Sequence, residues 1–232
     1  MTDLDSLRTA LTNEAPLTWV LAGDSITHGM MHTHAARSYP EHLHEAVRGD
    51  LLRFGDVMIT TAISGWRLHQ ILEDWPRRVA DWRPDVVTLM IGTNDCSVGP
   101  DLKTITPETF EQQLHNVVAR VRDIGALLIL QTPPEVDIEA RPDRSRFIEF
   151  VDVLRRVATD SGSGLVDHHA EFRARAQCLS LDYARPLLSD AFHPNAAGHA
   201  LMAHRFLSDL GLDPERCPTL GRLEAIVGAA TQ

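Results

Sequence analysis

Five short apolar runs, each followed by a segment with helical periodicity, constrain this chain more than any other feature. The runs are rich in β-branched and aliphatic residues, as strands are, and they lie at 18–25, 57–63, 85–91, 126–130 and 165–167. Because strand and helix patterns alternate along the chain, the sequence predicts an α/β fold with a doubly wound parallel sheet of about five strands.

The segments around these runs predict the helices. Apolar residues recur at the period of one helix face, and the expected helices lie at 3–11, 38–49, 66–82, 107–124, 147–159 and 195–210. Ser38 and Glu41 have the spacing of a capping box, and Pro76 predicts a kink in the helix at 66–82. No change in composition divides the chain. We therefore expect a single domain over 1–232, with a core at about 17–210 and a C-terminal tail at 211–232, whose structure is the hardest part of the chain to predict.

The charge balance limits the classes of partner. The chain has 22 basic and 32 acidic residues, a net charge of −10, which argues against nucleic acid or an anionic membrane surface. No apolar run approaches the about 18 residues of a transmembrane helix, and no signal-peptide pattern is seen. The three cysteines, Cys96, Cys178 and Cys217, are too widely spaced for a disulfide framework. We expect a cytoplasmic protein, and a homo-oligomer is left open.

The first apolar run ends in Gly23-Asp24-Ser25. A strand that ends in a glycine turn can hold the next hydroxyl in a fixed position, as a nucleophile requires, but Asp and Ser after a strand also commonly cap a helix. Gly65 and Asn94 follow the next two strands. Since ligands bind beyond the carboxyl ends of parallel strands, these residues are expected at one edge of the sheet.

Near the other end of the chain, Asp190 and His193 stand three residues apart. This spacing lets the carboxylate reach one imidazole nitrogen while the other points outward. Such a carboxylate fixes the tautomer of the ring, and a serine hydroxyl needs an adjacent base of this kind to become a nucleophile. The same spacing is common at helix starts, where it has no catalytic meaning.

Taken together, these motifs resemble the GDSL, or SGNH, hydrolase family over nearly the whole chain. The motifs, in order, are Gly23-Asp24-Ser25, Gly65, Gly92-Thr93-Asn94-Asp95 and Asp190-Ala191-Phe192-His193. The resemblance implies a flavodoxin-like, three-layer α/β/α fold. It also implies that Ser25 is the nucleophile, His193 the general base and then acid, and Asp190 its orienter. By the same resemblance, the oxyanion hole consists of the Ser25 and Gly65 N–H groups and the Asn94 amide. An α/β-hydrolase elbow fits less well, because Thr27 stands where G-x-S-x-G requires a glycine.

Several further residues are candidates for the substrate pocket. They are Asp24, His28, Trp66, Arg67 and Phe192. Asp24 has an equally good structural interpretation as a partner of the loop around Ser25, and Trp66 and Arg67 as helix-packing residues. The charged loop at 135–144 is expected to form part of the pocket rim.

The remaining histidines and Cys96 are not assigned to catalysis. Histidines cluster between 28 and 44, but His42 and His44 do not share a helix face and no HExxH motif appears, so the cluster predicts a pocket rim rather than a metal site. Cys96 is expected to be a buried small residue. The histidines expected at the surface or in caps are His168, His169, His199 and His204.

The expected activity is that of a serine esterase without a cofactor, which transfers a short acyl group from an ester to water. The resemblance favours an acetyl ester of a carbohydrate or small metabolite. A lysophospholipase or thioesterase is the near alternative, and an acyltransferase would use the same three residues. A non-catalytic binding module is disfavoured because it would not need Ser25, Asp190 and His193 together.

Overall fold

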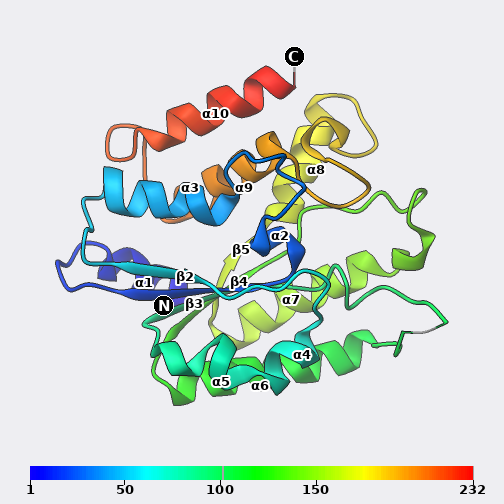
Figure 1. The fold of residues 1–232 in the computed structure, drawn as a ribbon, viewed down its shortest axis with the longest axis horizontal. Helices are drawn as coiled ribbons and strands as arrows, with labels where there is room; N and C mark the ends of the chain where they lie inside the picture. Colours follow the sequence, from blue (N-terminus) through cyan, green and yellow to red (C-terminus); the bar gives the residue numbers. More distant parts are fainter. Residues whose placement is uncertain (101, 232) are drawn as a thin grey trace.

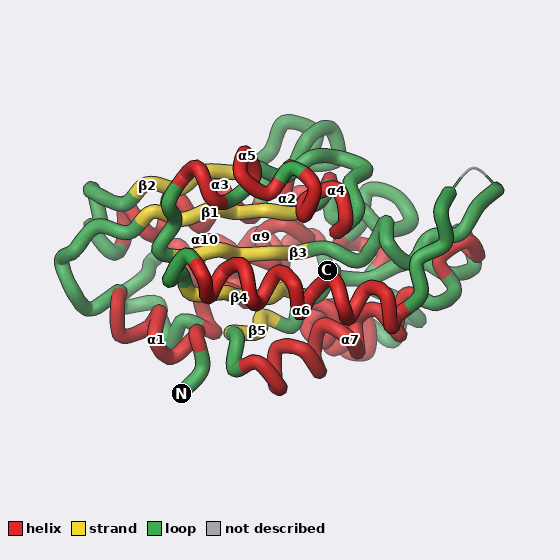
Figure 2. Tube along the Cα trace, turned by 90° about the horizontal axis from the view of Figure 1, so that it is seen from below, coloured by secondary structure: helices red, strands yellow, loops and turns green. Residues whose placement is uncertain are grey.

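The computed structural model describes residues 1–100 and 102–231, and its centre is one sheet of five parallel strands. The strand order is β2-β1-β3-β4-β5 (Figure 2), the flavodoxin-like order of a doubly wound sheet. The strands are β1 (Thr18–Gly23), β2 (Val57–Thr60), β3 (Val86–Met90), β4 (Leu127–Gln131) and β5 (Gly164–Val166). The predicted fold class is therefore confirmed.

Helices cover both faces of the sheet (Figure 1). One face is covered by α3 (Tyr39–Glu45), α8 (His168–Cys178), α9 (Ala196–Asp209) and α10 (Thr219–Ala230). The other face is covered by α4 (Leu68–Glu73), α5 (Trp75–Arg78), α6 (Pro107–Asp123) and α7 (Phe147–Ser161). The first helix, α1 (Asp3–Ala10), contacts β4 and β5.

The alternation of side chains along the strands explains the continuous apolar runs. In β1, Trp19 and Leu21 belong to the hydrophobic cluster that includes α3 and α9. Val20 and Ala22 belong to the cluster on the opposite face, together with residues of α4, α6 and α7. Since successive strand residues point to opposite faces, a sheet covered on both sides requires apolar residues at every position.

Three segments differ from the sequence-based prediction. The helix expected at 66–82 divides into α4, α5 and a 3₁₀ turn at Ala80–Trp82, because Pro76 cannot donate a backbone hydrogen bond within a continuous helix. The helix expected at 38–49 is α3 followed by a π-helical turn at Ala46–Asp50. The tail, for which the sequence predicted no element, contains α10, whose Leu223 and Val227 are buried in the same cluster as α9.

Two histidines expected at the surface or in caps are in fact buried. His168 is 0% exposed and His199 is 1% exposed. Burial lowers the pKa of each to about 3, so both rings are neutral. His168 bonds to the amide oxygen of Gln131, and His199 accepts the Tyr39 N–H at the start of α3. His199 is therefore a capping residue, but one supplied by a different helix.

The turn after β1 sets the position of Ser25. A Cβ on Gly23 would lie 2.5 Å from the Met90 carbonyl oxygen and 2.5 Å from the Thr27 hydroxyl oxygen, so only glycine fits against the neighbouring strand. The chain then enters α2 (Ser25–His28), a single helical turn that ends at Gly29. Ser25 is thereby held at the carboxyl end of β1.

Candidate active site

Ser25, His193 and Asp190 form a continuous hydrogen-bonded chain in the structure. The Ser25 hydroxyl bonds to Nε2 of His193 at 2.9 Å, and Nδ1 of His193 bonds to Asp190 Oδ2 at 2.8 Å. Ser25 and His193 are each 8% exposed. This geometry places a base on the serine hydroxyl and a carboxylate behind the base, as nucleophilic catalysis requires.

The loop from Asp190 to His193 is held by the same carboxylate that orients the ring. Asp190 Oδ1 accepts the backbone N–H groups of Phe192 and His193, both at 2.9 Å. Burial acts to raise the Asp190 pKa, but these hydrogen bonds and the contact with His193 outweigh it, so the pKa lies below its ordinary value. The carboxylate is therefore charged at neutral pH.

Burial lowers the pKa of His193 below its ordinary value, although Asp190 opposes this shift. The positive charge of Arg144 contributes to the lowering. A neutral imidazole can accept the proton of Ser25, so the low pKa keeps His193 in the form that a general base requires.

Asp24 confirms the capping interpretation without displacing Ser25 from the site. Its Oδ1 accepts the Ile26 N–H at 3.0 Å and caps α2. Burial raises the Asp24 pKa to about 7, and the neighbouring Asp95 adds to the shift. Asp95 is also fully buried, with a pKa that burial raises to about 7, and it accepts the Leu68 N–H at the start of α4. Both carboxyls support the loops that carry the site.

The structure brings the candidate oxyanion donors to the same edge of the sheet. Ser25 follows β1, Gly65 follows β2, and Asn94 follows β3. Among the described residues, neither the Ser25 nor the Gly65 N–H donates to a backbone carbonyl. Gly65 has a φ of +82°, and a Cβ there would meet no atom within 4 Å, so its backbone conformation and not its packing favours glycine. The Asn94 Nδ2 donates to the Trp66 carbonyl at 3.2 Å.

The expected pocket residues occupy different positions around this site. His28 Nδ1 bonds to the Ser64 hydroxyl at 3.1 Å and joins the Ser25 turn to the Gly65 turn. The Trp66 ring lies beneath the Arg78 guanidinium, at 5.0 Å. Arg67 is buried, and its Nη2 donates to the carbonyl and hydroxyl oxygens of Ser97. Its guanidinium therefore fixes the loop after β3.

His32 lies directly against the catalytic candidates, although the sequence pattern placed it only within a histidine-rich rim. Its ring stacks on His193 with centroids 3.5 Å apart and planes 6° from parallel. Its Nδ1 lies 3.7 Å from Asp190 Oδ2. The stacked ring covers one face of His193.

His32, Asp190 and His193 each offer a ligand atom, all within 4.8 Å of one another. The in-plane lone pairs of the two stacked imidazoles run in nearly parallel planes and do not converge on one ion. The arrangement fits proton transfer along Asp190 and His193 better than metal coordination.

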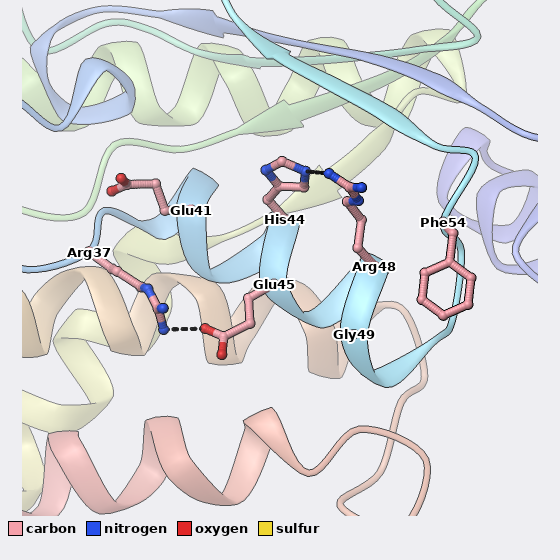
Figure 3. A pocket seen from close by; sticks show the side chains of 7 residues that line it. All are labelled: Arg37, Glu41, His44, Glu45, Arg48, Gly49 and Phe54. Carbon is pink, nitrogen blue, oxygen red and sulfur yellow. Dashed lines mark hydrogen bonds and ion pairs between the residues drawn. The ribbon is translucent and has the colours of Figure 1, made fainter.

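Ser25 lines none of the cavities described here. One cavity of about 470 Å³ contains no residue of the Ser25 site. It lies along α3 and the following π turn (Figure 3) and is lined by Arg37, Glu41, His44, Glu45, Arg48, Gly49 and Phe54. A cavity of about 270 Å³ borders Asp190 itself and is also lined by Asp137, Tyr183, Arg185 and Ser189.

Comparison with known proteins agrees with this geometry. The family model of the GDSL-like lipase/acylhydrolase family matches residues 21–201, from β1 into α9. The chain belongs to this family. It is therefore a carboxylic-ester hydrolase, as the sequence pattern predicts.

Individual relatives of this GDSL-like hydrolase include an acetylxylan esterase from Geobacillus stearothermophilus. It is 29% identical over 162 residues, which cover 67% of this chain and 73% of the relative. The crystal structure of Axe2, an acetylxylan esterase from the same organism, matches with a TM-score of 0.71 at 24% identity and covers 85% of this chain and 95% of that chain. LAE5, an α/β hydrolase from the Lake Arreo metagenome, matches with a TM-score of 0.71 at 27% identity, over 85% of this chain and 96% of that chain.

Among the described residues, no helix combines the length and the apolar character needed to cross a membrane.

Proposed function

We propose that this hydrolase removes a short acyl group, acetyl, from a carbohydrate ester through an acyl-enzyme on Ser25. The observation that carries the mechanism is the chain of hydrogen bonds from Ser25 through His193 to Asp190, at 2.9 and 2.8 Å. No cofactor is needed, because the serine supplies the nucleophile and the histidine moves the protons.

In the first step, Ser25 Oγ attacks the ester carbonyl carbon while its proton moves to His193 Nε2. The negative charge that develops on the carbonyl oxygen is stabilised by the Ser25 and Gly65 N–H groups and the Asn94 amide. His193 then gives its proton to the departing alcohol oxygen. Water attacks the acyl-enzyme by the same route, which releases the acid and restores the serine.

The cavity that borders Asp190 supports a carbohydrate as the alcohol part of the ester. His193 protonates the leaving oxygen from Nε2, and Asp190 lies behind the ring at Nδ1, so an extended alcohol part would pass the His193 ring before it reaches this cavity. There the cavity presents the carboxyl of Asp137, the phenol of Tyr183 and the guanidinium of Arg185. Such groups donate to and accept from the hydroxyls of a sugar. The similarity to the acetylxylan esterase of G. stearothermophilus points the same way.

Two substrate series test the proposal. The first compares p-nitrophenyl esters from acetyl to decanoyl, and kcat/KM is expected to fall steeply beyond short chains; a maximum at long chains would favour a lipid substrate. The second compares acetylated xylo-oligosaccharides with p-nitrophenyl acetate in the variant Arg185→Met. The variant is expected to raise KM for the oligosaccharide and to leave p-nitrophenyl acetate unchanged. Equal effects on the two substrates would contradict a sugar site at this cavity.

A further inference from the structure

Arg144 contacts both the loop that carries the oxyanion candidate Asn94 and the loop that carries the base His193. It lies in the loop between β4 and α7, within a 3₁₀ turn at Pro142–Arg144, and it is 5% exposed. The sequence pattern placed this loop at the pocket rim without singling out any residue. A buried guanidinium is costly unless its N–H groups are paired, so its partners indicate why it is there.

One set of partners lies on the loop that carries Asn94. Arg144 Nε donates to the Thr93 carbonyl at 3.1 Å, and Nη2 lies 3.4 Å from the Asn94 Oδ1. The guanidinium has only donors, so it selects the oxygen end of the Asn94 amide. The nitrogen end must then point the other way. One of its protons reaches the Trp66 carbonyl, and the second remains for an oxyanion.

The charge of Arg144 also strengthens Asn94 as a donor. A cation near the amide oxygen polarises the amide, which makes its N–H groups more acidic. The contact is long for a hydrogen bond, at 3.4 Å, so this effect is mainly electrostatic. It acts in a buried place, where charges are weakly screened.

Arg144 also pairs with the neighbouring Asp143, and a further contact lies on the loop that carries the base. The Arg144 guanidinium carbon is 4.2 Å from the centroid of the Phe192 ring, the position of a cation–π contact. Phe192 directly precedes His193, and the two rings are 4.2 Å apart. The same guanidinium therefore contacts the oxyanion loop on one side and the support of the base on the other.

We propose that Arg144 is a positioning residue that aims the Asn94 amide at the oxyanion and fixes Asn94 relative to His193. This inference rests on the proposed function, because it assigns Asn94 to the oxyanion hole. Arg144 itself does not contact the reacting atoms.

Arg141 is a matched control for this proposal. Its guanidinium lies over the same Phe192 ring, at 5.0 Å, and pairs with the same Asp143 that Arg144 contacts. Its side chain is 37% exposed, and its hydrogen bonds go to Asp143 and not to the Asn94 loop. Loss of Arg141 thus removes a nearby cation without removing the partner of Asn94.

The test measures kcat and KM for p-nitrophenyl acetate in Arg144→Ala, Arg144→Lys and Arg141→Ala. Titration with a fluorophosphonate counts the competent sites in each preparation, so kcat refers to folded enzyme. Loss of one oxyanion donor costs about 10²–10³ in kcat, so a misaligned donor in Arg144→Ala is expected to cost about 10- to 100-fold, with little change in KM. Arg144→Lys is expected to show a smaller fall in kcat than Arg144→Ala, because the lysine ammonium keeps the charge but cannot replace the planar guanidinium with its several donors. Arg141→Ala is expected to match the wild type.

Two further readouts separate positioning from a merely structural role. Millimolar guanidinium is expected to restore part of the kcat of Arg144→Ala, whereas urea is not. The acid limb of the pH profile is expected to move to higher pH, because Arg144 helps to lower the His193 pKa. The groups that face His193 there are Asp190, His32 and Arg144.

A kcat within about twofold of wild type in Arg144→Ala, or an equal loss in Arg141→Ala, would overturn the proposal. If Arg144→Ala does not fold, full activity in Arg144→Lys would overturn it as well. The proposed function fails separately, if Ser25→Ala retains wild-type activity.

Discussion

The substitution Asp190→Asn tests how His193 is prepared to act as a base. Asp190 Oδ1 accepts the Phe192 and His193 backbone N–H groups, and an asparagine oxygen can do the same. The loop is therefore expected to keep its shape. The asparagine NH₂ would then face His193 Nδ1. Because the NH₂ group can only donate, Nδ1 would have to accept this hydrogen bond and could no longer carry the ring proton. The ring proton moves to Nε2, and Ser25 loses its acceptor.

The size of the effect follows from burial and from the triad chemistry. A wrong tautomer in a fully buried triad costs about 10⁴ in kcat. The Asp190 side chain is 44% exposed, so water can partly replace the carboxylate. We expect a fall of about 10³ in kcat, which corresponds to about 4 kcal/mol of lost transition-state stabilisation.

The assay is p-nitrophenyl acetate hydrolysis as a function of pH, with Asp152→Asn as the control. Asp152 is an exposed carboxylate on α7 that pairs with Arg155. Asp190 acts to raise the His193 pKa, so its loss lowers that pKa and moves the acid limb to lower pH. A loss of less than about tenfold in Asp190→Asn, or an acid limb displaced to higher pH, would refute the reasoning.

Three further predictions concern buried groups and the glycine turn. Burial raises the Asp24 pKa from 3.8 to about 7, so the wild type loses stability as pH rises from about 4 to 7. Asp24→Asn should remove up to ~3 kcal/mol of the loss between pH 5 and pH 8, measured by urea unfolding; an equal effect at both pH values would contradict it. Gly65→Ala should cost ~1 kcal/mol in unfolding free energy, because φ is +82°, and should lower kcat, because relief of that strain shifts the Gly65 N–H; since alanine keeps the N–H group itself, an unchanged kcat would contradict this shift. Iodoacetamide should label exposed Cys178 but not buried Cys96, whose thiol pKa burial raises to about 12; mass spectrometry of the native protein decides, and labelled Cys96 would refute its burial.

The fold was predictable because its pattern is local and repeated. The apolar runs at 85–91 and 126–130 need cover on both faces, and the structure supplies it in β3 and β4. The division of the helix at 66–82 was signalled by Pro76, whereas α10 was not, because its stability depends on burial of Leu223 and Val227 against α9. Such tertiary packing leaves only a weak mark on the sequence.

The site divides in the same way. That Ser25, Gly65 and Asn94 lie together was predictable because each follows a strand that ends at one edge, and the contact between Asp190 and His193 because their spacing is short. Arg144 and His32 were not. Their contacts with Asn94 and His193 join loops that lie far apart along the chain, and arginine and histidine in a loop are ordinary surface residues in any sequence pattern.

The most direct test of the central claim measures Ser25 itself. Wild type and Ser25→Ala are compared for p-nitrophenyl acetate hydrolysis and for covalent labelling by a fluorophosphonate, located by mass spectrometry. A nucleophilic Ser25 predicts one label per wild-type chain on the peptide that contains Ser25, and neither label nor significant hydrolysis in Ser25→Ala. Equal hydrolysis by the two proteins, or a label on another serine, would contradict the mechanism.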